Sequence, residues 1–163
     1  MTSAITTATD LRSVLRNVPT PISFIATHTD QPLGMIVGSF VSISAEPPLV
    51  GIFLQKGSSS WPAIEQALVT GQELGISILG GAHADHVRKL SGPSDQRFEN
   101  LEWASTENGA IHLEGADAQL TTKLHNLQEI GDHFFAVLEV IDASADQDFS
   151  SALVYHRSQV SSL

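Results

Sequence analysis

The stretch that decides the fold is GMIVGSFVSISAEPPLV, residues 34–50. From residue 35 to 44, apolar and β-branched residues alternate imperfectly with glycine and serine, which predicts a strand buried on one face. Pro47 and Pro48 cannot continue a central ladder, because proline has no N–H to donate, so the chain must turn a corner there. The apolar run at residues 49–54 predicts the next strand.

Strand signals recur along the rest of the chain without regular helical crossovers. This succession favours a mainly β fold, an antiparallel barrel with short helices at its ends, over a doubly wound sheet. Asp10 is expected to cap the first helix, and Pro19 and Pro21 to end it. Residues 95–108 should be irregular, and residues 142–150 an acidic turn. The predicted strands are 22–27, 35–44, 49–54, 74–79, 110–121, 134–141 and 152–156, and the predicted helices are 10–17, 61–70 and 82–90.

Length and composition indicate one domain over residues 1–163, in which residues 1–10 are expected to form a flexible tail. The 42% of hydrophobic residues suffice for a core, but no apolar run is long enough for a membrane span, and we expect no signal peptide. There is no cysteine, which excludes disulfides and thiolate chemistry and suits a cytoplasmic location. The net charge of −10 argues against nucleic-acid binding.

The small and polar residues of the 34–44 strand could line a planar ligand. Gly38 would let the backbone come close, and the hydroxyls of Ser39 and Ser42 could bond to polar atoms at a ring edge. On composition alone, an ordinary core strand with solvent-facing serines explains the same residues.

The segment that follows, residues 55–62, places a lysine, a glycine and three serines just before a predicted helix. Backbone amides and the helix dipole favour an anion at such a position, so Lys56, Ser58 and Ser60 are candidates to hold a phosphate. A serine that caps the helix on an exposed loop is the simpler alternative.

Other kinds of site find less support. His83 and His86 are spaced by three residues around Asp85, but no third ligand has an obvious spacing, so we expect no metal. No G-x-S-x-G elbow and no G-x-G-x-x-G turn after a strand are present, which argues against a serine hydrolase and against a Rossmann nucleotide site.

Two motifs, in order and at similar spacing, give the chain a family resemblance. The run from Gly34 to Pro48 resembles the glycine-methionine-threonine-x-asparagine/serine-serine-phenylalanine and serine-x-serine-x-x-proline-proline signature of flavin reductase-like proteins. Gly131, Asp132 and His133 match the glycine-aspartate-histidine triplet that this family carries before a late strand. The resemblance spans residues 11–157.

The resemblance implies a Greek-key, FMN-binding split β-barrel, usually a homodimer with the flavin near the subunit interface. It implies NADH- or NADPH-dependent reduction of FMN or FAD, which then diffuses to a partner oxygenase. It places His133 beside the flavin, where the nicotinamide stacks, and the arginine-phenylalanine pair at 97–98 over the flavin face. The cofactor-binding residues that it implies are Ile36, Val37, Gly38, Ser39, Ser42, Gln55, Lys56, Ser58, Ser60, Ser91, Phe98, Tyr155 and Arg157.

The chain departs from the family pattern at several of these positions. Ile36 stands where a threonine is usual, Gly38 replaces asparagine or serine, and Leu90 replaces a phenylalanine. Residues 158–160 lack the usual glycine-x-tyrosine. Two alternatives to a reductase therefore stay open: another small-molecule reaction with His133, His156 and Asp132 as acid–base groups, and a non-catalytic flavin carrier.

Overall fold

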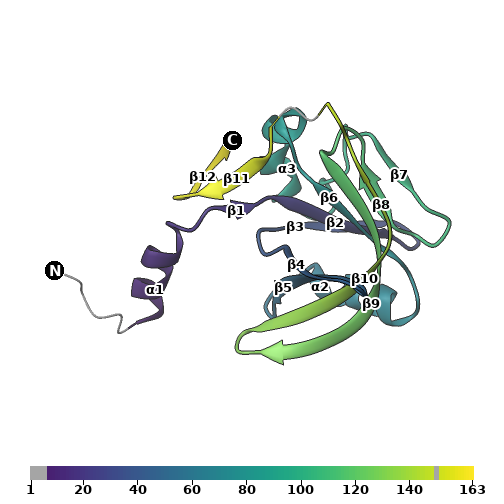
Figure 1. Ribbon diagram of the computed structural model, residues 1–163, viewed down its shortest axis with the longest axis horizontal. Helices are drawn as coiled ribbons and strands as arrows, with labels where there is room; N and C mark the ends of the chain where they lie inside the picture. Colours follow the sequence, from purple (N-terminus) through teal and green to yellow (C-terminus); the bar gives the residue numbers. More distant parts are fainter. Residues whose placement is uncertain (1–6, 149–150) are drawn as a thin grey trace.

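The computed structural model describes residues 7–148 and 151–163, which form a curled antiparallel sheet with two smaller sheets and short helices around it (Figure 1). All described strand pairs are antiparallel, so the predicted mainly β class is confirmed. The seven-stranded sheet has the order β3 (Pro32–Val37), β2 (Ser23–His28), β6 (Leu74–Ile78), β9 (Ala118–Ile130), β10 (His133–Ala145), β5 (Pro48–Gln55), β4 (Val41–Ala45).

The smaller sheets and the helices cover the ends of the large sheet. One small sheet joins β1 (Thr20–Pro21), β11 (Leu153–His156) and β12 (Gln159–Ser162), and the other joins β7 (Trp103–Ser105) and β8 (Ile111–Leu113). The helices are α1 (Ala8–Leu15), α2 (Trp61–Val69), the 3₁₀ helix η1 (Gly81–His86) and α3 (Val87–Leu90). None of the described helices is long and apolar enough to span a membrane.

The core consists of two clusters that share strand β2. Ile25 packs into a cluster with Trp61 and Ile64 of α2, whereas Phe24 packs on the other face with Val87 and Leu90 of α3. Both faces of β2 are therefore buried, which explains its continuous apolar run.

The single strand predicted at residues 35–44 is wrong, because the chain breaks at residues 38–40. The Ser39 hydroxyl donates to the Phe53 carbonyl (2.8 Å) and accepts from the Phe53 N–H (2.9 Å), so a side chain takes the place of the ladder. β3 and β4 lie at opposite edges of the seven-stranded order, yet three residues separate them. The sheet therefore curls so that its two edges come near each other, although β3 and β4 do not pair within residues 7–148 and 151–163, which is consistent with a split barrel. The corner at Pro47 is confirmed, since β4 and β5 pair as a hairpin around it.

Several other boundaries differ from the prediction. The strand expected at 110–121 is two strands, β8 and β9, separated by a turn in which Gly115 has φ of +76°. β10 continues to Ala145, into the expected acidic turn, because β9 pairs with it along that length. β7 lies inside the expected irregular segment, β12 was not predicted, and the helix expected at 82–90 is η1 followed by α3.

The first helix is capped by Thr7 rather than Asp10. The Thr7 hydroxyl oxygen accepts from the Asp10 N–H at 3.2 Å, so the helix begins before Asp10 and ends before Pro19. Of the segment expected to be a tail, residues 1–6 lie outside the described residues, and Ala8 is the first residue of α1.

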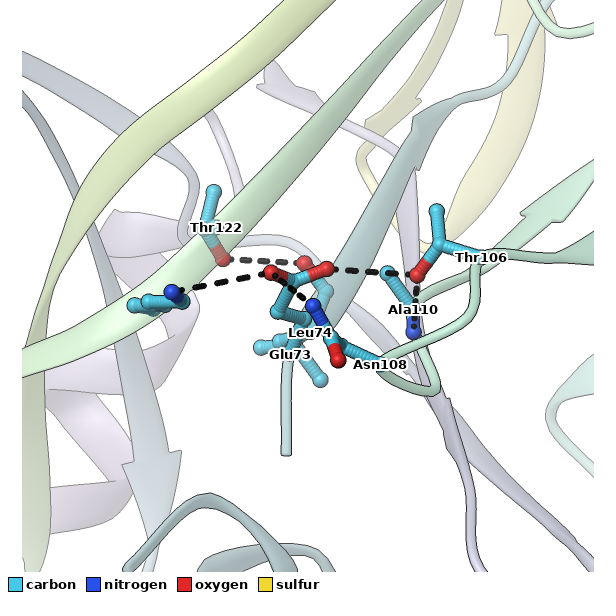
Figure 2. A network of polar contacts seen from close by, with 7 residues as sticks. Glu73, Leu74, Thr106, Asn108, Ala110 and Thr122 are labelled. Carbon is cyan, nitrogen blue, oxygen red and sulfur yellow. Dashed lines mark hydrogen bonds and ion pairs between the residues drawn. The ribbon is translucent and has the colours of Figure 1, made fainter. Parts of the chain in front are cut away.

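A buried carboxylate ties the turn at residues 106–110 to the start of β6. Glu73 is only 6% exposed and accepts hydrogen bonds from Thr106 Oγ1 and Asn108 Nδ2, both at 3.2 Å. Figure 2 shows the three side chains pointing at one another, with the Thr122 hydroxyl donating to the Leu74 carbonyl beside them (3.0 Å). Lys123 Nζ lies 3.8 Å from Glu73, but its side chain is 54% exposed.

We therefore expect Glu73→Ala to lower the free energy of unfolding by about 2 kcal/mol, because the Thr106 hydroxyl and the Asn108 amide lose the buried acceptor that ties their turn to β6. Lys123→Ala, the matched change on the exposed partner, should cost less than about 1 kcal/mol. Urea unfolding monitored by circular dichroism measures both. Equal losses in the two variants would contradict the assignment of most of the stabilisation to the hydrogen bonds from Thr106 and Asn108 rather than to the ion pair with Lys123.

Candidate functional site

Two adjoining clefts open between β3, α2 and the η1–α3 segment. The first has a volume of about 520 Å³ and is mostly apolar, with Ile22, Val87 and Val160 among its lining residues. The second has a volume of about 420 Å³ and contains the serine loop before α2 together with Arg97. Ile36 and Ser91 line both clefts, so the two form one continuous surface.

Seven of the predicted site residues meet at these clefts, although they come from four separate segments of the chain. Gly38 and Tyr155 line the first cleft, and Gln55, Ser58 and Ser60 line the second. Ile36 and Ser91 join the two.

Three residues of the predicted ring edge lie elsewhere. Val37 is buried in the core cluster with Ile25, because its side chain lies on the inner face of β3. The Ser39 hydroxyl is already bonded to both backbone groups of Phe53. Ser42 lies on β4 opposite Val50 and lines neither cleft.

Phe98 likewise packs away from the clefts. Its ring makes edge contacts with Phe24 and Trp103, with centroids 5.5 and 5.7 Å apart. It belongs to the second core cluster, where it lies against the backbone of Gly34. Phe98 therefore packs against β3 as part of the second core cluster and lines neither cleft.

The two basic residues predicted to meet a phosphate have other partners. Lys56 Nζ forms an ion pair with Glu129 (3.0 Å) and lies 5.7 Å from the ring centroid of Phe134. Arg157 joins α1 to β11, because its Nε donates to Asn17 Oδ1 (3.0 Å) and its N–H donates to the Arg16 carbonyl (2.9 Å).

His133 is the first residue of β10 and pairs across the ladder with Gln55, a residue of the second cleft. Its Nδ1 lies 2.7 Å from Asp132 Oδ1. This hydrogen bond and the charge of the imidazole lower the pKa of Asp132, with a smaller contribution from Arg12 of α1. The carboxylate is therefore placed to fix the orientation of the His133 ring.

The serine loop matches the simpler of its two interpretations and leaves room for the other. The Ser58 hydroxyl accepts from the N–H groups of Ser60 and Trp61, both at 3.3 Å, so it caps the start of α2. Ser60 uses its hydroxyl differently, as an acceptor from Arg97 Nη1 at 2.8 Å.

Arg97, which the resemblance places over the flavin face but which is not among the predicted cofactor-binding residues, lies in the second cleft. Besides Ser60, its Nη1 donates to the Gly34 carbonyl (2.6 Å), and its Nε donates to the Gly92 carbonyl (2.9 Å). It therefore joins β3, the start of α2 and the segment after α3, the three walls of the second cleft. Burial lowers the pKa of Arg97, but a guanidinium keeps its charge at neutral pH. Its place in the Gln96-Arg97-Phe98 run, in an acidic chain, was the available signal.

His83, the first histidine of the η1 pair, serves the fold. His83 is 3% exposed, and its Nε2 lies 3.0 Å from the Glu114 carbonyl. Burial lowers the pKa of His83. Within residues 7–148 and 151–163, no group of three or more histidine, aspartate or glutamate side chains is placed to hold a metal ion.

Comparison with known proteins adds three findings. A family model described as "Flavin reductase like domain" matches residues 15–163. The chain is 31% identical over 146 residues to a flavin reductase of Pseudomonas putida, which covers 88% of this chain and 84% of that protein. It is 32% identical over 124 residues to the reductase subunit of a flavin-dependent monooxygenase of Mycobacterium tuberculosis, which covers 76% and 64%.

A solved structure is similar over almost the whole fold. The Streptomyces globisporus NADH:FAD oxidoreductase in complex with NAD and FAD fragments superposes with a TM-score of 0.83 at 28% identity, which covers 94% of this chain and 90% of that one. The family match includes every residue that lines the two clefts.

Proposed function

Because the chain belongs to the flavin reductase-like domain family, we propose that it is an NAD(P)H:flavin oxidoreductase that supplies reduced FMN or FAD to a partner monooxygenase. The observation that carries the proposal is the pair of joined clefts, one apolar and one polar, which seven of the predicted site residues line. The family resemblance drawn from the sequence is confirmed by the match of the family model to residues 15–163.

The two clefts fit the two ends of a flavin mononucleotide. The first cleft offers apolar walls for a ring system, with Gly38 allowing close approach of the β3 backbone. The second offers hydroxyls, the amino end of α2 and the Arg97 guanidinium for a phosphate. In a chain with a net charge of −10, this local cation offsets an unfavourable overall field.

Flavin supplies the redox chemistry, since its ring accepts a hydride from the reduced nicotinamide. The residues of this chain hold and orient the two rings. We assign the ring wall to Ile36, Gly38 and Tyr155. We assign the binding of the phosphate to Ser60 and Arg97. Ser58 stabilises the loop, because its hydroxyl caps the start of α2.

His133, oriented by Asp132, lies next to Gln55 at the edge of the second cleft and would orient the nicotinamide. Lys56 and Arg157 would first have to leave Glu129 and Asn17 to contact a phosphate, so we give them secondary roles at most.

The test is a steady-state assay of NADH and NADPH oxidation, with and without added FMN or FAD. We expect flavin-dependent oxidation, and a loss of about tenfold or more in kcat/KM for His133→Ala, because the nicotinamide loses its orienting group. His125→Ala, on the exposed face of β9, is the matched control and should match wild type. Flavin bound one-to-one without turnover would favour the carrier alternative, and a bound ligand other than flavin would favour the alternative of different chemistry.

We further propose that the chain is a single-domain cytoplasmic homodimer. Apolar side chains are exposed on β4 and β10, with Val41 40%, Ile43 43% and Ile141 48% exposed. α1 stands away from the sheets and exposes Leu11 and Val14 (Figure 1). Such surfaces typify subunit interfaces. A mass equal to one chain in analytical ultracentrifugation at micromolar concentration would contradict the dimer.

A further inference from the structure

Met35 carries the only sulfur atom within residues 7–148 and 151–163, because the chain has no cysteine and its other methionine is Met1. Its side chain is partly buried against the core cluster that contains Ile25 and Trp61. It also lines the second cleft, together with Ser58. A small molecule that enters this cleft therefore reaches a thioether beside the space that we assign to the flavin phosphate.

Ser58 connects this thioether to the serine loop. Its hydroxyl donates to Met35 Sδ at 3.8 Å, a weak hydrogen bond because a thioether is a poor acceptor. The same hydroxyl oxygen accepts from the N–H groups of Ser60 and Trp61 at the start of α2. The Ser60 hydroxyl in turn accepts from Arg97. A chemical change at the sulfur atom therefore acts on the group that holds the loop and, through it, on the two residues that we assign to the phosphate.

We propose that Met35 is an oxidation site, at which hydrogen peroxide converts the thioether into a sulfoxide and thereby lowers the affinity of the protein for FMN. The inference rests on the proposed function, because an enzyme that reduces flavin in air generates this oxidant itself. Dioxygen takes two electrons and two protons from reduced flavin and becomes hydrogen peroxide. Peroxide that forms at the clefts meets Met35 before it reaches the bulk solvent.

The modification is a two-electron transfer of one oxygen atom. The sulfur lone pair of Met35 attacks one peroxide oxygen, the O–O bond breaks and an S–O bond forms. The departing hydroxide takes the proton that the transferred oxygen loses, so the products are methionine sulfoxide and water. Sulfur is oxidised and peroxide is reduced, with no further reactant. Methionine sulfoxide reductases reverse the change, so the site is a switch rather than a lesion.

A sulfoxide changes both contacts of the Met35 side chain. Because it is polar, it no longer suits the apolar core cluster, and its oxygen turns toward the second cleft. That oxygen is a stronger acceptor than the thioether and draws the Ser58 hydroxyl away from the start of α2. Its partial negative charge also faces the space assigned to the phosphate. We therefore expect oxidation to weaken FMN binding about fivefold or more and to lower the melting temperature by about 3 °C or more.

The test treats the purified protein with added hydrogen peroxide, so that it does not depend on turnover. Peptide mass spectrometry follows the oxygen gained at Met35, and the oxidation of Met1 in the same sample shows that the peroxide has reacted. The dissociation constant of FMN, from flavin fluorescence, and the melting temperature are measured before and after treatment. Met35→Leu keeps the apolar volume without a thioether and is the matched control, compared with its own untreated sample.

We expect wild type to gain one oxygen at Met35, with weaker FMN binding and a lower melting temperature, and a methionine sulfoxide reductase to restore both. Treated and untreated Met35→Leu should agree. Oxidation of Met1 without Met35, or oxidation of Met35 with both properties unchanged, would overturn the inference and leave the reductase proposal standing. Conversely, a protein whose Met35 responds to peroxide but which oxidises neither NADH nor NADPH with flavin supports the oxidation site and contradicts the reductase proposal alone.

Discussion

Arg97→Ala is expected to weaken FMN binding about hundredfold, because charged hydrogen bonds contribute about 1.5–3 kcal/mol each and a factor of ten corresponds to about 1.4 kcal/mol. The substitution removes the cation of the second cleft. It also removes three hydrogen bonds that join Gly34, Ser60 and Gly92, so the walls of the cleft lose their common link. Titration of flavin fluorescence measures the dissociation constant.

Two comparisons separate the charge from the link between the walls. Riboflavin lacks the phosphate, so its affinity should fall much less than that of FMN in the alanine variant. Arg97→Lys keeps a charge but cannot reproduce the planar fork, and should lie between wild type and alanine. An alanine variant that keeps its melting temperature and binds FMN as wild type does would contradict the assignment of the phosphate to Arg97.

Gly75→Ala should lower the free energy of unfolding by about 3 kcal/mol or more, since overpacking against a fixed backbone has no cheap relief. Gly75 lies in β6, and a methyl group there would run into the backbone oxygen, carbon and nitrogen of Ile111 in β8. β8 cannot withdraw without separating the two core-facing residues Ile111 and Leu113 from their cluster.

The control for this change is Gly57→Ala, where an added Cβ has no atom within 4 Å and the backbone does not need a positive φ. Its free energy of unfolding should stay within about 0.5 kcal/mol of wild type. The midpoint of urea unfolding at constant slope measures both variants. If Gly75→Ala were as stable as Gly57→Ala, the close approach of β6 and β8 would be wrong.

The sequence predicted the class of the fold because its signals are local. The apolar run at 49–54 became β5, the tryptophan-proline start at residue 61 became α2, and the proline pair at 47–48 marks the turn between β4 and β5. The break at Ser39 was not visible, because it depends on Phe53, a residue fourteen positions away. A serine that replaces a ladder hydrogen bond has the same local pattern as a serine that faces solvent.

The candidate site could be predicted in outline but not in its contacts. The motifs correctly indicated segments that meet at the clefts, such as those of Ile36, Gln55 and Ser91. The long basic side chains were harder to place, because each can reach several partners. Lys56 extends to Glu129, 73 residues away, and Arg97 reaches the Gly34 carbonyl over 63 residues. A main-chain carbonyl as partner leaves no trace in residue identity, so only the fold could show which groups Arg97 contacts.

The most direct test of the central claim is anaerobic rapid mixing of the protein and FMN with NADH, following the nicotinamide and flavin absorbance bands together. The account predicts that both bands are lost one-to-one, faster than in a mixture without protein, and that the rate falls in His133→Ala. Nicotinamide oxidation without flavin reduction, or no change in either band with NADH, NADPH, FMN or FAD, would contradict it.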